Sequence, residues 1–120
     1  MDSEFDITKR FGKDIARLPK EDERKIAASI DKYAATLDTS QAAHNQRIYQ
    51  PKGLLVPRGF DSSIYVLRAT QKLRVILTIE DDPLFGRKLI TLLRVVKHDE
   101  LERALASIAE SLYQHLRSEG

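Results

Sequence analysis

Three apolar segments joined by short links constrain the fold of this chain more than any other feature. Residues 64–70, 73–79 and 88–96 are rich in Ile, Val, Leu and Tyr, residue types that favour β-strands. The links at residues 71–72 and 81–87 are too short for a crossover, so consecutive strands pair antiparallel. The sequence therefore predicts a meander of three antiparallel strands.

The segments on either side of this meander predict helices and one more strand. Residues 5–8 alternate apolar and polar side chains, which indicates a short strand. Residues 11–18 and 20–37 carry apolar side chains at helical spacing and form a hairpin that is interrupted at Pro19. Residues 99–117 repeat the helical spacing after the meander. We expect one α+β domain over residues 1–120, with the helical hairpin packed on a small antiparallel sheet and a C-terminal helix.

A long link precedes the meander. Residues 38–62 contain two prolines and two glycines, which indicates a loop with at most a short strand at residues 47–50. The link carries Arg47 and Lys52 near aromatic residues such as Tyr49. That mixture suits single-stranded nucleic acid, and it equally suits a loop that its aromatic side chains hold against the core.

The composition limits the chemistry that this chain can perform. It has no cysteine, which excludes disulfides and thiolate catalysis and is compatible with the reducing cytoplasm, where we expect the protein. No apolar segment is long enough to span a membrane. The sequence has no metal-ligand spacing and no glycine-rich phosphate loop, so we expect neither a metal nor a cofactor.

Basic residues are spread along the meander, whereas its acidic residues gather at one turn. A surface of this kind attracts a polyanion; the alternative is a set of ordinary charges on the solvent face of a half-buried sheet. The basic residues between positions 64 and 98 are Arg68, Lys72, Arg74, Arg87, Lys88, Arg94 and Lys97, and the acidic ones are Glu80, Asp81 and Asp82.

Side chains alternate between the two faces of a strand, which decides which cations meet. The odd positions of residues 73–79 are all apolar and should face the helices, so Arg74 lies on the open face. A two-residue turn would place Arg68 on the other face, and a three-residue turn would place it directly opposite Arg74. Like charges directly opposed on a sheet are destabilising, so the second arrangement would favour an anion between the two guanidinium groups.

The third strand ends at a histidine. Strict alternation puts Arg94 and His98 on one face together with Ile90, Leu92 and Val96. An imidazole transfers protons near neutral pH, so His98 is a candidate general acid or base. A solvated or capping histidine is the plainer alternative.

The C-terminal helix must bury an apolar stripe. It lies on the chain's own sheet, or it packs against a second copy in a homodimer. If it covers the open face of the sheet, phosphate binding there is disfavoured and binding of a partner protein is favoured. The stripe consists of Leu101, Leu105, Ile108 and Leu112.

In element order and in its motifs, the chain resembles the RelE/ParE-like toxins of bacterial type II toxin–antitoxin systems. The resemblance implies a small antiparallel sheet that carries a helical hairpin, and a cognate antitoxin protein as partner. The motifs are Phe11-x-Lys13-x-Ile15-x-x-Leu18 in the first helix, Ile64-Tyr65-Val66-Leu67-Arg68 followed by Leu73-Arg74-Val75-Ile76-Leu77, and Leu92-Leu93-Arg94-Val95-Val96-Lys97-His98-Asp99.

Ribosome-dependent members of this family are endoribonucleases that cut mRNA in the ribosomal A site without a metal. The resemblance implies that Arg74, with Arg68 or Arg94, holds the scissile phosphate and that His98 moves a proton. The other candidates for RNA or phosphate binding are Lys72, Lys97, Arg47 and Lys52.

The first strand of the meander departs from the ribonuclease pattern. Residues 64–66 carry no cation or acid where ribonuclease members have a lysine or glutamate, and the tyrosine that usually follows the last strand is absent. Two other functions therefore stay open. One is a module that inhibits a protein target such as gyrase without nuclease chemistry, and the other is a catalytically inactive interaction protein that dimerises through its C-terminal helix.

Overall fold

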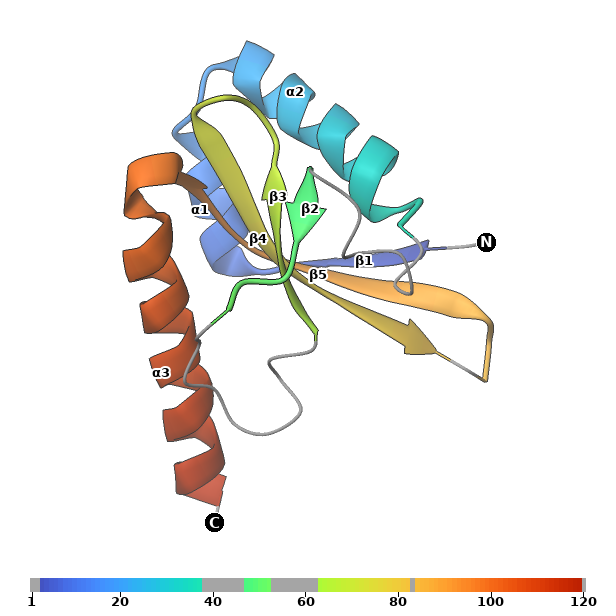
Figure 1. Ribbon diagram of the computed structural model, residues 1–120, viewed down its shortest axis with the longest axis vertical. Coiled ribbons are helices and arrows are strands. Elements are labelled where there is room, and N and C mark those ends of the chain that lie inside the picture. Colours follow the sequence, from blue (N-terminus) through green and yellow to red (C-terminus); the bar gives the residue numbers. More distant parts are fainter. Residues whose placement is uncertain (1–2, 38–46, 53–62, 83, 120) are drawn as a thin grey trace.

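The predicted meander forms the centre of a five-stranded sheet (Figure 1). Strands β3 (Ile64–Arg68), β4 (Leu73–Asp82) and β5 (Arg87–Lys97) are antiparallel neighbours, as predicted. The short strand β2 (Ile48–Tyr49) pairs with β3, and β1 (Ser3–Ile7) pairs with β5 at the other edge. The computed structural model describes residues 3–37, 47–52, 63–82 and 84–119, with side chains as far as residue 111.

The sheet is mixed, whereas the sequence predicts an antiparallel one. Strand β1 runs parallel to β5, with Phe5 beside Ile90 and Ile7 beside Leu92. Alternation along residues 5–8 indicates a strand, but it carries no information on which strand lies beside it or in which direction. The α+β class is confirmed, with helices on the sheet and a helix at the C-terminal end.

A helical hairpin covers one face of the sheet. Helix α1 (Lys9–Ala16) begins at Thr8, whose hydroxyl accepts a hydrogen bond from the Phe11 N–H at 3.2 Å. Helix α2 (Lys20–Ser29) follows Pro19, and its acidic first turn suits the positive end of the helix dipole. The helical path continues as the π-helical turn η1 (Ile30–Ala34). None of the helices in the described part of the chain is long and apolar enough to cross a membrane.

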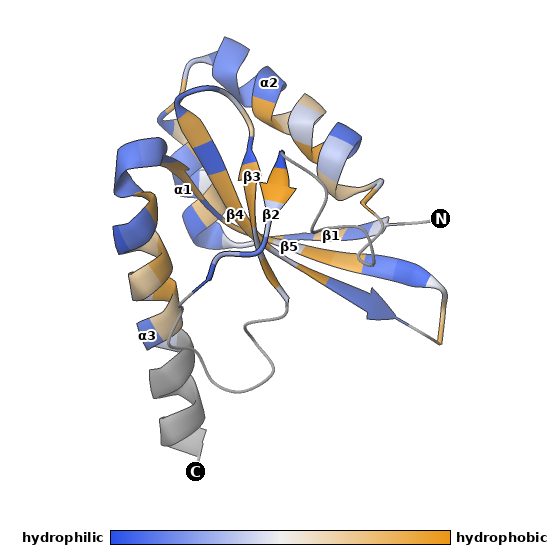
Figure 2. Ribbon diagram, viewed as in Figure 1, coloured by the Kyte–Doolittle hydropathy of each residue, from blue (hydrophilic) through white to orange (hydrophobic). Residues whose placement is uncertain are grey.

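Two apolar clusters lie on opposite faces of the sheet, whose central strands are largely apolar in Figure 2. The larger cluster lies between the hairpin and the sheet, and the alternate residues of β4 predicted to face the helices all belong to it. The smaller cluster lies under helix α3 (Leu101–Glu119), which follows the 3-10 turn η3 (His98–Glu100). Its sheet residues are Ile64, Val66, Ile76 and Val96.

Helix α3 therefore lies on the chain's own sheet. Leu105 is buried in the smaller cluster, and Leu101 and Ile108 pack against it. Leu101 and Ile108 are half-buried, and the side chain of Leu112 lies outside the described residues. The homodimer through this stripe stays a prediction. The prediction that this helix buries an apolar stripe was correct, but the stripe does not specify which apolar surface covers it.

A β-bulge on β5 overturns the prediction that five alternate residues share one face. Ile76 pairs with Arg94, but the next residue, Leu77, pairs with Leu92, so Leu93 is an extra residue. Ile90 and Leu92 consequently belong to the cluster under the hairpin. Val96 belongs to the cluster under α3, because every residue after the bulge has changed face.

Candidate functional site at one end of the sheet

The turn between β3 and β4 settles the position of Arg68. The register pairs Arg68 directly with Arg74, which requires the three-residue turn 70–72. The Thr70 hydroxyl accepts hydrogen bonds from the Leu73 N–H at 3.1 Å and the Lys72 N–H at 3.3 Å. Thr70 thereby stabilises the turn, and the two arginines lie on the same face of the sheet.

The guanidinium group of Arg74 folds back onto this turn. Its Nη1 donates to three backbone carbonyls, those of Thr70 at 2.8 Å, Leu73 at 3.1 Å and Gln71 at 3.2 Å. The side chain is half-buried. A guanidinium group has five N–H donors, and those on Nε and Nη2 have no hydrogen-bond partner within the described residues. Arg74 therefore holds the turn with one nitrogen and can offer the others to an anion.

Arg68 is exposed and lies over an aromatic ring. Its guanidinium carbon is 5.3 Å from the centroid of the Tyr49 ring. Its backbone N–H donates to the Arg47 carbonyl at 2.8 Å, and Arg47 Nη1 donates to the Arg68 carbonyl at 3.4 Å. The two opposed arginines thus have different partners, a ring for one and carbonyls for the other. This separation reduces the repulsion between them.

The end of β5 adds further positive charge. Lys97 pairs with Leu73, and the His98 N–H donates to the Lys72 carbonyl at 2.8 Å. The side chains of Lys72, Lys97 and His98 are all exposed. Asp99 and Glu100 follow at once and are exposed as well. We call the set Arg47, Arg68, Lys72, Arg74, Lys97 and His98 the basic end of the sheet.

Arg94 is separated from the basic end by its own partner. Its Nε donates to Asp14 Oδ2 at 2.7 Å and its Nη2 to Asp14 Oδ1 at 3.4 Å. The same carboxylate accepts the Val95 backbone N–H at 2.9 Å. The side chain of Asp14 is 8% exposed, so this is a buried link between α1 and β5.

The importance of Asp14 was not recognised in the sequence. Asp14 stands three residues after Phe11 and four before Leu18, on the apolar stripe of the first helix. A carboxylate at such a position is expected to be buried and to need a cation, so the signal was present.

Lys52 also lies apart from the basic end. Strand β2 starts at the Arg68 end of the sheet and runs away from it, and Lys52 follows three residues after Tyr49. Its side chain is exposed. Of the predicted site residues, the structure brings Arg47, Arg68, Lys72, Arg74, Lys97 and His98 together, and it places Arg94 and Lys52 elsewhere.

Helix α3 packs on the middle of the face on which the two arginines lie. Ala104 and Leu105 pack on Ile64, Val66 and Ile76, the residues that precede Arg68 and follow Arg74 in the same rows. Arg68 and Arg74 therefore lie at the rim of the covered area, beside the turn 70–72. Exposed cations at this rim can bind anionic groups, but the middle of the face is closed to a ligand.

The described residues offer little besides cations for chemistry at this end. They contain no group of three His, Cys, Asp or Glu side chains that could hold a metal ion. Tyr65 lies in the cluster on the other face, and burial, helped by the Asp81 carboxylate, raises the pKa of its phenol above the usual 10.0. Tyr65 is therefore neutral at physiological pH. Within the basic end, His98 has the type of side chain that most often acts as a general acid or base in enzymes.

Two solved structures are similar to this fold. A copper-bound mutant toxin from Helicobacter pylori is 18% identical, with a TM-score of 0.46 over 82% of this chain and 97% of that chain. A YoeB/ParE toxin from Agrobacterium tumefaciens is 14% identical, with a TM-score of 0.47 over 82% of this chain and 99% of that chain. Both of those proteins are toxins, and the likeness of this chain to them concerns the fold alone. Neither a protein-family model nor a curated protein matches the sequence.

Proposed function

We propose that this chain is a toxin-like protein of a type II toxin–antitoxin system and that its basic end binds an acidic partner protein, the antitoxin, in the bacterial cytoplasm. The observation that carries the proposal is the direct pairing of Arg68 with Arg74 across two strands. Two opposed guanidinium groups repel each other, and a carboxylate between them relieves the repulsion while accepting charge-assisted hydrogen bonds.

The position of α3 favours a protein partner over a nucleic acid. Binding of a single strand usually needs a continuous basic groove with aromatic rings on which bases stack. Helix α3 closes the middle of this face, and Tyr49, the ring nearest Arg68, already contacts that guanidinium group. A compact rim of cations suits a few carboxylates of a peptide better than a long phosphate chain.

The test uses the small acidic protein that a toxin–antitoxin arrangement predicts in the neighbouring reading frame. The two proteins are co-expressed, and the affinity of the purified pair is measured by titration calorimetry at two salt concentrations. We expect Arg68→Ala/Arg74→Ala to weaken binding about 100-fold, because two charge-assisted contacts are lost. The matched control is Arg10→Ala/Arg24→Ala, which removes two exposed arginines from the helical hairpin. Equal affinity of both double variants contradicts the proposal.

A ribosome-dependent mRNA endoribonuclease, independent of metal ions, is the second candidate. The observation that favours it is the exposed side chain of His98, whose backbone is hydrogen-bonded to the turn that Arg74 holds. Arg74 would stabilise the charge on a scissile phosphate, and His98 would move the proton of the attacking ribose hydroxyl.

Growth arrest and mRNA cleavage separate the two candidates. The chain is induced in a bacterial host, and cleavage of a reporter mRNA is mapped by primer extension in a ribosome-containing extract. A nuclease predicts cleavage by the parent and at least about a 100-fold loss in His98→Ala, the contribution of one general acid or base. Growth arrest without cleavage contradicts the nuclease and leaves inhibition of a protein target, such as gyrase, as the toxic activity.

A further inference from the structure

Strand β1 is an exposed edge of the sheet (Figure 1). It pairs with β5 on one side, and no strand within the described residues lies on its other side. Glu4, Phe5, Asp6 and Ile7 are all exposed, and the exposed fractions of the two large apolar side chains, Phe5 and Ile7, are 39% and 60%. An open edge of this kind can pair with a strand of another protein.

The backbone groups of Phe5 and Ile7 point away from the sheet. The Thr8 N–H donates to the Leu92 carbonyl at 3.2 Å, so Thr8 directs its backbone groups toward β5. Neighbouring residues of a strand direct their N–H and C=O groups to opposite sides, and residues two apart direct them to the same side. Phe5 and Ile7 therefore hold donors and acceptors outward, where an additional strand can bond to them.

The side chains of β1 differ in chemistry between the two faces of the sheet. Phe5 and Ile7 lie on the face that the helical hairpin covers, beside residues of the larger apolar cluster. Glu4 and Asp6 lie on the other face, because side chains alternate along a strand. Glu4 pairs with Arg87 at 3.1 Å, and Asp6 has no ion-pair partner within the described residues. A strand that docks on β1 therefore meets apolar side chains on one face and carboxylates on the other.

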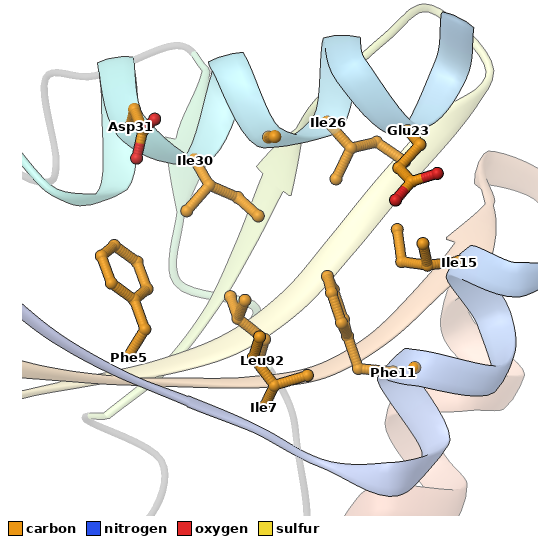
Figure 3. Close-up of a pocket in the computed structure, with 11 residues that line it drawn as sticks. Phe5, Ile7, Phe11, Ile15, Glu23, Ile26, Ile30, Asp31 and Leu92 are labelled. Carbon is orange, nitrogen blue, oxygen red and sulfur yellow. The ribbon is translucent and has the colours of Figure 1, made fainter. Parts of the chain in front are cut away.

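A groove continues the apolar side of this edge. Phe5, Ile7 and Leu92 of the sheet, with residues of α1, α2 and η1, line a groove of about 370 Å³ (Figure 3). Among the described residues that line it, the two charged ones, Glu23 and Asp31, are both acidic and lie at its two ends. Neither has an ion-pair partner in the described part of the chain. The groove therefore suits apolar side chains that are flanked by positive charge.

A second copy of this chain does not fit the edge. Twofold symmetry makes two β1 strands antiparallel, and their outward backbone groups pair only where odd-numbered residues face odd-numbered ones. A pairing centred on Phe5 sets Glu4 of one copy directly against Asp6 of the other, and like charges in that position are destabilising. The acidic partner proposed for the basic end is unsuited to this edge for the same reason.

We propose that the outer edge of β1 and the adjoining groove bind an extended segment of a basic partner protein, in which apolar residues alternate with lysine or arginine. The segment adds a strand to the sheet through Phe5 and Ile7. Its apolar side chains enter the groove, and its basic side chains meet Asp6 on the other face and Glu23 and Asp31 at the ends of the groove. The site is independent of the proposed function, because the two surfaces are opposite in charge.

The first test measures the binding of a defined peptide to the full chain by fluorescence anisotropy. The probe is a fluorescein-labelled peptide of about nine residues, the length of one strand, in which lysine alternates with valine, isoleucine and leucine. We expect a Kd on the order of 10 µM. A peptide with glutamate in place of each lysine should bind at least about 30-fold more weakly, because carboxylates then face carboxylates. A peptide of the parent composition with its lysines in one block should also bind weakly, because its apolar residues no longer share one face.

Variants of the chain test the charged ends of the groove. Glu23→Lys/Asp31→Lys should weaken binding of the lysine peptide at least about 10-fold, because attraction becomes repulsion at both ends. The matched control, Glu100→Lys/Glu102→Lys, makes the same change in net charge at two exposed positions at the start of α3 and should bind like the parent. Thermal unfolding of both double variants checks that they are folded.

Methylation of the probe's backbone tests whether it adds as a strand. In a docked strand every second N–H faces β1. These are the N–H groups of the apolar residues if the segment runs antiparallel to β1, and those of the lysines if it runs parallel. N-methylation of one set should therefore weaken binding at least about 30-fold, and methylation of the other should be tolerated. Equal affinities of the two methylated peptides, unchanged binding by Glu23→Lys/Asp31→Lys, or equal binding of the lysine and glutamate peptides overturns the proposal.

Discussion

Two arginines that stand in similar sequence contexts have different environments in the structure. Arg94 and Arg74 each follow an aliphatic residue on a strand of the meander. Arg94 is held by the buried carboxylate of Asp14, with a closest contact of 2.7 Å. Arg74 lies at the rim of the sheet, where it contacts backbone carbonyls and faces Arg68 across the strands.

The difference shows that a cation on a core-like strand has two distinct uses. A buried, paired cation joins elements of the fold, and its removal leaves the partner carboxylate buried without its charge partner. A cation at the rim has spare donors and remains available to a ligand. Stability and binding should therefore respond in opposite ways when the two regions are altered.

The largest effect is expected when the Asp14–Arg94 pair is broken. Asp14→Ala should lower the free energy of unfolding by about 3 kcal/mol, because Arg94 and the Val95 N–H lose their acceptor inside the protein. Urea denaturation measures the change, and Asp6→Ala, at an exposed position on β1, is the control. Binding at the basic end should be unaffected.

A double-mutant cycle tests the pairing directly. Arg94→Met should also destabilise the chain, because it leaves the Asp14 carboxylate with the Val95 N–H as its remaining donor among the described residues. The combined variant Asp14→Ala/Arg94→Met should then cost clearly less than the sum of the two single changes. If the two losses are additive, the ion pair does not act as a unit and the contrast with the basic end is lost.

Arg74→Ala should have an intermediate effect. It removes a half-buried side chain that donates to three backbone carbonyls at the turn, and we expect a loss of about 1 kcal/mol in unfolding free energy. Arg74→Lys keeps the positive charge but lacks the planar set of guanidinium donors. It should therefore retain much of the partner affinity, while its unfolding free energy should be as low as that of Arg74→Ala. If Arg74→Ala costs as much stability as Asp14→Ala and leaves binding intact, Arg74 belongs with Arg94 as a structural residue.

The smallest effect on stability is expected at Arg68. At this residue, the change in stability and the change in partner affinity should differ most clearly. Arg68→Glu places opposite charges directly across β3 and β4 and should raise the unfolding free energy by about 0.5 kcal/mol. The same change should abolish binding of an acidic partner, because it puts a carboxylate where the partner's carboxylate should bind. Arg68→Gln, which removes the charge alone, should give intermediate affinity. A stabilised Arg68→Glu variant that binds like the parent would show that the partner binds elsewhere.

Local patterns predicted the elements well because they depend on neighbours close in sequence. The period of apolar residues located the helical hairpin, and the short links required β3, β4 and β5 to be antiparallel. Alternation on β4 correctly assigned Arg74 to the face opposite the helical hairpin. The same rule was wrong on β5, because one extra residue at the bulge exchanges the faces of everything that follows it.

The sequence predicted that the candidate site is basic, but it did not predict correctly which basic residues lie together. Charge along residues 64–98 indicated a basic surface, and six of the eight named side chains lie at one end of the sheet. Arg94 was assigned to the site because sequence does not reveal a carboxylate 80 positions away. Lys52 was a candidate because basic and aromatic residues are interleaved in the link, and the direction of β2 takes it away from the other cations.

By itself, the sequence determined the secondary structure, the α+β class and the presence of cations on strands, because these follow from local periodicity and residue type. The tertiary structure alone decided three further points. It set the register that opposes Arg68 and Arg74, it placed α3 over the face that they share, and it brought Asp14 to Arg94. Each of these points depends on a single residue in a turn or a bulge, or on contact between distant segments. The local periodicity of the sequence predicts neither the exact length of a turn nor such a contact.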